Sequence, residues 1–129
     1  MTADLVCLTL IASRQFRQEL FDYLTAQSDL VSGFTASDAA GHGATVRLST
    51  PAERVKGHAD QVLVRIVLAK PDAEQLLVRL RAAFAGSQLV YWIMPVVGFG
   101  MVDGCSTDHS HPSLDVLLGE GRKPLEEMK

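Results

Sequence analysis

Four stretches of the chain have the hydrophobic patterns of β-strands. Residues 5–12 are apolar at nearly every position, which is typical of a central strand buried on both faces. Residues 61–68, with the sequence QVLVRIVL, alternate between two faces, and residues 88–94 form a short run of strand-forming residues stopped by Pro95. The run GFTASDAAGHG, at residues 33–43, is interpreted as the remaining strand. A fifth short segment at residues 96–102 is also considered.

Two amphipathic segments separate these strands. The first begins at Ser13, which stands where an N-cap is expected, and it ends near Gln27. The second opens with Pro71 and Asp72 and is closed by Gly86, a candidate for a left-handed C-cap. The order strand, helix, strand, strand, helix, strand predicts an α+β fold with the ferredoxin-like βαββαβ arrangement.

This arrangement leaves one face of the sheet without a cover. Two helices can cover only one face of a four-stranded sheet, whereas residues 5–11, 62–68 and 89–94 are apolar on both faces. We therefore expect sheet-to-sheet packing in a closed homo-oligomer. The alternative is that the C-terminal segment covers the second face. Its apolar side chains are Leu114, Val116, Leu117 and Leu118.

The connection between the second and third strands is far longer than a hairpin needs, which is typical of a binding loop. If the two strands pair antiparallel, the ends of the connection lie close together and offer backbone amides, one cation and two imidazoles. The sequence thus predicts a site for a small anion. Its residues are Gly41, His42, Gly43, Lys56, Gly57 and His58. The alternative is that the glycines serve loop geometry and the polar side chains are solvated.

A second cluster of polar residues lies in the C-terminal quarter, within MVDGCSTDHSHP. Cys105, His109 and His111 are residue types that bind zinc or copper, and they predict a metal site there. The alternative is a solvated loop. We expect residues 1–102 to form one domain and residues 103–129 to form a flexible tail.

Composition restricts the classes of function. The 129 residues are 47% hydrophobic and 21% charged, with a formal net charge of -3 and no basic stripe, so nucleic acid is not an expected partner. The apolar run at residues 5–12 has no cationic leader and is too short to span a bilayer, so we expect a cytoplasmic protein without membrane insertion. No nucleophile stands beside a base and an orienting group, so we do not expect an enzyme.

Several of these features together resemble the PII-like superfamily, which includes nitrogen regulatory PII proteins and CutA proteins. They are the split pattern, the long connection with GFTASDAAGHG before it, the ERVKG run at residues 53–57 and YWIMPV at residues 91–96. More narrowly, they resemble a proteobacterial subfamily often encoded beside heavy-metal efflux pumps of the resistance-nodulation-division type. The resemblance covers residues 5–102. It implies a homotrimer with inward-packed sheets, a mobile T-loop at residues 44–55 and intersubunit ligand clefts.

The chain departs from the PII pattern in two places. PII proteins bind adenine nucleotides in these clefts through a glycine-rich loop, which is reduced here to Ala85-Gly86-Ser87, and the T-loop lacks their tyrosine. The resemblance implies a regulatory protein that binds a small anion or an adenine nucleotide and then alters its contact with a membrane transporter or regulator. The alternative is a cytosolic protein that binds copper or zinc through its tail.

Overall fold

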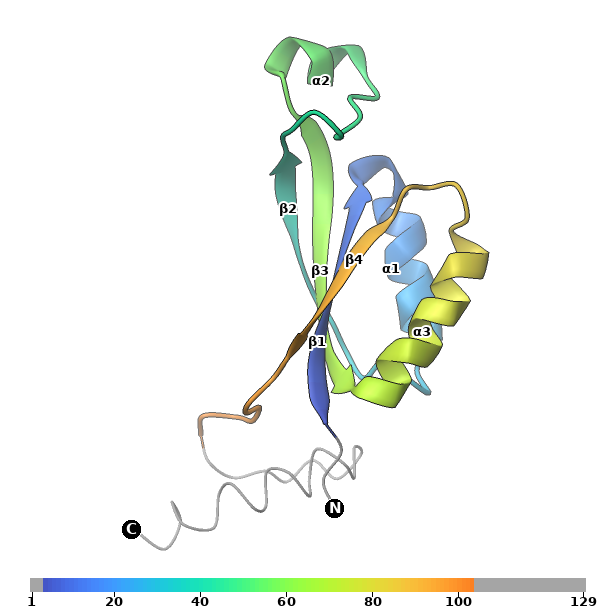
Figure 1. Ribbon diagram of the computed structural model, residues 1–129, viewed down its shortest axis with the longest axis vertical. Coiled ribbons are helices and arrows are strands. Elements are labelled where there is room, and N and C mark those ends of the chain that lie inside the picture. The colour runs from blue at the N-terminus through green and yellow to red at the C-terminus, as the bar shows by residue number, and fades with distance from the viewer. Residues whose placement is uncertain (1–3, 104–129) are drawn as a thin grey trace, which may run out of the picture.

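The computed structural model describes residues 4–103 and forms a two-layer α+β domain (Figure 1). One antiparallel sheet has the strand order β2-β3-β1-β4. The strands are β1 (Leu5–Ser13), β2 (Thr35–Gly41), β3 (Ala59–Ala69) and β4 (Val90–Pro95). The helices are α1 (Arg17–Ala26), α2 (Pro51–Lys56) and α3 (Lys70–Ala83), with a short 3-10 turn, η1 (Arg14–Phe16), before α1. This order confirms the predicted ferredoxin-like arrangement.

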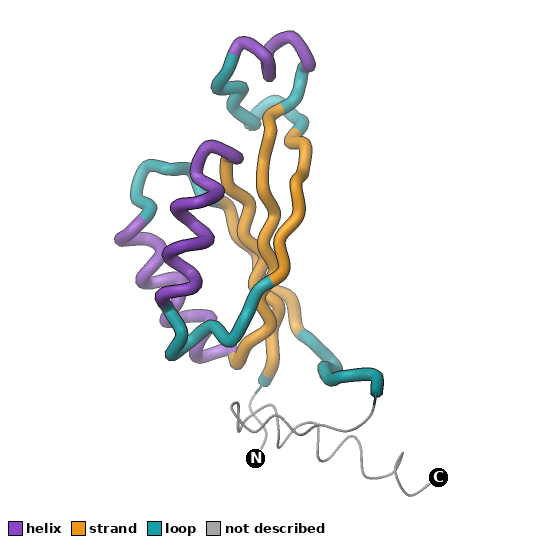
Figure 2. Tube along the Cα trace, turned by 180° about the vertical axis from the view of Figure 1, so that it is seen from behind, coloured by secondary structure: helices purple, strands orange, loops and turns teal. Residues whose placement is uncertain are grey.

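Helices α1 and α3 lie against the same face of the sheet, as the view from behind also shows (Figure 2). The even-numbered residues of β1 and β3 point toward them, and the register pairs Leu8 with Ile66 and Leu10 with Val64. These four side chains are completely buried. Truncating any of them should cost about 1–5 kcal/mol, since a buried aliphatic side chain leaves a cavity. Within residues 4–103, no helix has the length and apolar character needed to cross a membrane.

The structure corrects three predicted boundaries. Ser13 pairs with Gln61 as the last residue of β1 and stands at the N-cap position of η1, but it makes no side-chain capping bond. Because the first turn is a 3-10 turn, α1 begins only at Arg17. Helix α3 ends at Ala83, and Gly86 has the expected left-handed backbone three residues later. Strand β4 begins at Val90 because Gln88 has a φ of 62°, which no extended strand accommodates.

No element within residues 4–103 covers the second face of the sheet, which we call the open face (Figures 1 and 2). On β4 it carries Val90, Trp92 and Met94, which are 51%, 43% and 54% exposed. The neighbouring strands add further apolar side chains, namely Cys7, Ile11, Leu63 and Val67. The single chain therefore has the uncovered apolar face that the sequence predicts. The tail residues considered as an alternative cover lie outside the described residues.

Candidate ligand-binding site

Pairing between β2 and β3 brings the two predicted halves of the anion site together. Gly41 is the register partner of Ala59, so residues 41–43 and 56–58 meet at one end of the sheet. The rings of His42 and His58 have their centroids 5.2 Å apart, at an angle of 48°. The predicted juxtaposition is thus present, while ligand binding at these residues stays a prediction.

Backbone geometry accounts for two of the three glycines of this cluster. Gly43 and Gly57 have φ angles of 126° and 85°, in the region that favours glycine, and Gly57 is the C-cap of α2. At Gly41 a Cβ would meet only the end of the Gln61 side chain, which is flexible and can turn away. Gly43 and Gly57 therefore serve the fold of the connection and give no separate support for a ligand.

Lys56 is already engaged by a carboxylate that the sequence interpretation missed. Its Nζ donates hydrogen bonds to both carboxylate oxygens of Asp60, at 2.8 and 2.9 Å. These bonds are the main reason why the pKa of Asp60 is lowered from its ordinary value. A ligand anion must therefore compete with Asp60 for Lys56. The i, i+4 spacing of Lys56 and Asp60 was the available signal, but it crosses the end of a helix.

Arg14 is a second residue that the sequence interpretation missed. Its guanidinium lies over the end of the β2–β3 pair, and Nη2 donates to the carbonyl oxygens of Ala39 and Gln61 at 3.3 and 3.4 Å. The Nε atom is 3.7 Å from a carboxylate oxygen of Asp38, and Nη1 is 3.9 Å from Asp60. Arg14 thus adds a cation beside the predicted cluster.

Two nitrogen atoms in this region are buried without a hydrogen-bond partner among the described residues. They are Nε of Arg14 and Nδ1 of His58, which is 4.0 Å from the nearest Asp60 oxygen. Buried polar atoms are nearly always bonded to protein or water, so each exception asks for an explanation. A small ligand or an ordered water that reaches this end of the sheet would supply the missing partners.

The connection between β2 and β3 is not a structureless loop, because residues 51–56 form α2, which projects beyond the end of the sheet (Figure 1). A capping box begins this helix. The Thr50 hydroxyl accepts from the Glu53 amide at 3.1 Å, and Glu53 Oε1 accepts from the Thr50 amide at 3.1 Å. The sequence signal was Thr50 followed three residues later by Glu53, with Pro51 at the first helical position.

Glu53 also fastens α2 to the sheet. Its Oε2 accepts from the Asp60 amide in β3 at 2.6 Å, while Oε1 accepts from the Ser49 amide at 2.6 Å. The side chain is buried, with only 3% of the residue exposed. The hydrogen bond from the Asp60 amide, followed by that from the Ser49 amide, lowers the pKa of Glu53 from its ordinary value. One ionised carboxylate thus joins the connection to the beginning of β3.

The predicted metal ligands Cys105, His109 and His111 lie outside the described residues. Between residues 4 and 103, no group of three or more histidine, cysteine, aspartate or glutamate side chains is placed to hold a metal ion. A tail metal site therefore stays a prediction that binding experiments must test.

Replacing His109 and His111 together by alanine should weaken zinc or copper binding by orders of magnitude, because imidazole nitrogens are the principal neutral ligands of these ions. Calorimetry with each metal measures the change. The matched control replaces His42 and His58 by alanine, which also removes two imidazoles. Equal metal affinity in the His109/His111 variant and the unchanged chain would assign the tail histidines to solvated loop.

Comparisons with known proteins agree with the fold. Residues 2–103 match the model of a family described as "Protein of unknown function (DUF3240)". A search of curated proteins gave no match. Among solved structures, the chain is similar to a DUF3240 family protein from Shewanella baltica, with a TM-score of 0.61 and 20% identity. The alignment covers 79% of this chain and 99% of that protein.

Two further similar structures belong to PII-like proteins. A putative PII-like signalling protein from Thermus thermophilus has a TM-score of 0.51 and 17% identity, over 73% of this chain and 88% of that one. The PII-like protein CPII from Thiomonas intermedia, solved with ADP, AMP and bicarbonate bound, has a TM-score of 0.56 and 16% identity. That alignment covers 78% of this chain and all of CPII. At these identities the likeness establishes a PII-like fold.

Proposed function

The chain belongs to the DUF3240 family, and on this basis we propose that it is a homotrimeric regulatory protein of the PII type that binds a small anion in clefts between its subunits. Binding at the base of the β2–β3 connection changes the order of α2 and of the residues before it. The altered connection then changes contact with a membrane transporter or regulator. Because of the resemblance described above, we propose that this transporter or regulator takes part in heavy-metal efflux.

The observation that carries this proposal is that Nε of Arg14 and Nδ1 of His58 are buried at the base of a projecting connection without a hydrogen bond from any residue between 4 and 103. Both side chains can donate hydrogen bonds to an oxygen anion. CPII was solved with bicarbonate and adenine nucleotides bound, so these are the ligand classes to test first. A polar ligand here would satisfy groups that otherwise remain costly to bury.

The residues after α3 favour a small anion over a nucleotide. In the segment 85–87, Gly86 is the single glycine, and the Ser87 hydroxyl already donates to the carbonyl of Phe84 at 2.7 Å. A phosphate cradle needs several free backbone amides and short side chains that let the phosphate approach. A small carboxylate or bicarbonate does not need such a cradle. Small oxygen anions are therefore the ligand class that we propose.

The charges of the candidate site predict how anion binding depends on pH. Arg14 and Lys56 face three carboxylates, those of Asp38, Asp60 and Glu53. Each imidazole that takes up a proton on acidification would add one positive charge to this end of the sheet. Anion affinity should therefore rise as pH falls, whereas metal affinity should fall because a protonated imidazole cannot bind a metal.

Acetate keeps the same charge between about pH 6 and pH 8, so it isolates the contribution of the protein. We expect several-fold tighter acetate binding at the lower pH by calorimetry or NMR titration, and no such pH dependence after His42→Ala with His58→Ala. Lys56→Ala should weaken binding at both pH values, because it removes the cation closest to the Asp60 carboxylate. Bicarbonate and ADP are compared at the higher pH. If acetate affinity is the same at both pH values and is unchanged in Lys56→Ala, the ligand site lies elsewhere.

A further inference from the structure

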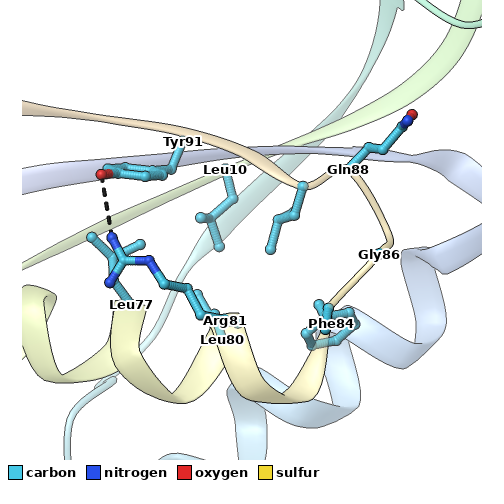
Figure 3. A pocket seen from close by; sticks show the side chains of 10 residues that line it. Leu10, Leu77, Leu80, Arg81, Phe84, Gly86, Gln88 and Tyr91 are labelled. Atoms are coloured by element: carbon cyan, nitrogen blue, oxygen red, sulfur yellow. Dashed lines mark hydrogen bonds between the residues drawn. The ribbon is translucent and has the colours of Figure 1, made fainter.

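A pocket of about 260 Å³ lies between the C-terminal half of α3 and the start of β4 (Figure 3). It shares no residue with the candidate anion site. The described residues that form its apolar floor are Leu10, Leu77 and Leu80, which are 0%, 7% and 2% exposed. Phe84 and Leu89 add further apolar surface. An aromatic or aliphatic group placed here would be removed from water on the side that contacts this floor.

The rim of this pocket carries one cation and one phenol. Nη2 of Arg81 donates a long hydrogen bond of 3.5 Å to the Tyr91 hydroxyl, and the guanidinium carbon is 5.9 Å from the centre of the Tyr91 ring. Figure 3 shows this pair at one end of the pocket, with Gly86 and Gln88 toward the other. Arg81 takes no part in the ion pairs formed within residues 4–103. It can therefore accept a carboxylate without breaking an ion pair within these residues.

The turn that limits the pocket has an unusual backbone. Gly86 and Gln88 have φ angles of 82° and 62°, and Gln88 is the single non-glycine residue with positive φ among residues 4–103. Such a conformation is uncommon for a residue with a side chain, and strained residues gather at ligand sites. This turn holds α3 and β4 apart at the place where the pocket lies (Figure 3).

We propose that this pocket is a binding site for a small molecule that combines one apolar ring with one carboxylate. A dry apolar cavity of about 150 Å³ accommodates benzene, so the larger volume here suits a ring with a short acidic side chain. Guanidinium and carboxylate form two parallel hydrogen bonds, and a phenol hydroxyl can add a third. The apolar floor holds the ring while Arg81 and Tyr91 hold the carboxylate.

The test uses phenylacetate as the probe, with 2-phenylethanol carrying the same ring without the charge and acetate carrying the charge without the ring. By NMR titration of the full chain, phenylacetate should bind at least about tenfold more tightly than either analogue, with shifts centred on α3 and β4. Arg81→Gln should reduce its affinity to that of 2-phenylethanol. The control Arg54→Gln, which changes an exposed arginine of α2, should leave it unaltered.

A second variant tests access to the pocket separately from its charge. Ala85 is an exposed lining residue, so Ala85→Trp should fill the opening and abolish binding of phenylacetate and 2-phenylethanol without disturbing the core. Equal phenylacetate affinity in the unchanged chain, Arg81→Gln and Ala85→Trp would overturn the proposal. So would the absence of binding at millimolar phenylacetate. Neither result bears on the His42 and His58 site, because its acetate titration follows different residues.

Discussion

Light scattering on the full chain should return about three times the 14.0 kDa chain mass at micromolar concentration. The open face explains this expectation, because Trp92 and its neighbours form a contiguous apolar surface of a kind that soluble monomers rarely leave in water. A closed arrangement of three identical chains buries the same face of each one. A well-behaved monomer would contradict both the assembly and the intersubunit clefts of the proposed function.

Two matched variants test whether the open face forms the contact. Met94 on β4 and Val78 on α3 are 54% and 56% exposed in the single chain, so an isolated subunit would tolerate a charge equally well at either position. Met94→Glu should dissociate the trimer or raise its dissociation constant by at least about tenfold, since burying an unpaired carboxylate is costly. Val78→Glu should remain trimeric. Identical masses for both variants would exclude β4 from the interface.

The sequence predicted the architecture because its apolar periods are long and consistent. The alternation of residues 61–68 predicts which side chains lie on each face of β3. The apolar run of β1 predicts that both faces of that strand are covered. The local starts and stops were less predictable. Ser13 has both the residue type and the extended backbone of an N-cap, but the turn that follows it is a 3-10 turn, so the α-helix starts only at Arg17.

The candidate site was predictable only in part, for a related reason. Antiparallel pairing brings His42 and His58 together, and a sequence can indicate that pairing. Which charged side chains lie beside these histidines depends on the exact strand register, and no local sequence pattern specifies that register. Arg14 reaches carbonyl groups 25 and 47 residues away, and the pocket beside Arg81 joins residues from three elements and a turn. Such contacts become visible only in the folded chain.

The fold also suggests how a ligand could move α2 without disturbing the sheet. The strands are held by continuous hydrogen-bonded pairing, whereas the connection is joined to β3 through the Glu53 carboxylate and the pair between Lys56 and Asp60. An element with so few attachments can open locally at a small fraction of the cost of global unfolding. An anion that draws Lys56 away from Asp60 would remove one attachment and leave Glu53 as the remaining one.

Replacing Glu53 by glutamine should release α2 while the sheet stays folded. A glutamine carries one acceptor oxygen and places an NH₂ group where Glu53 now receives amide hydrogens, so the bonds from Ser49, Thr50 and Asp60 cannot all survive. Amide exchange at residues 53–57 should accelerate at least about tenfold, whereas exchange in the centre of β3 should not change. Glu74→Gln, at an exposed position on α3, is the control and should change neither.

The pH dependence of amide exchange tests the role of Glu53 without a mutation. Because its hydrogen bonds lower the pKa of Glu53 in the folded chain, its stabilising contribution is complete above the ordinary glutamate pKa and is lost as pH falls through the lowered value. Protection of the α2 amides, corrected for intrinsic exchange, should therefore fall on acidification before protection of β3 falls. In the Glu53→Gln variant that early loss should shrink to the part caused by protonation of Asp60, which still pairs with Lys56. Protection of α2 that declines in parallel in both proteins would mean that Glu53 is not the group that fastens the helix.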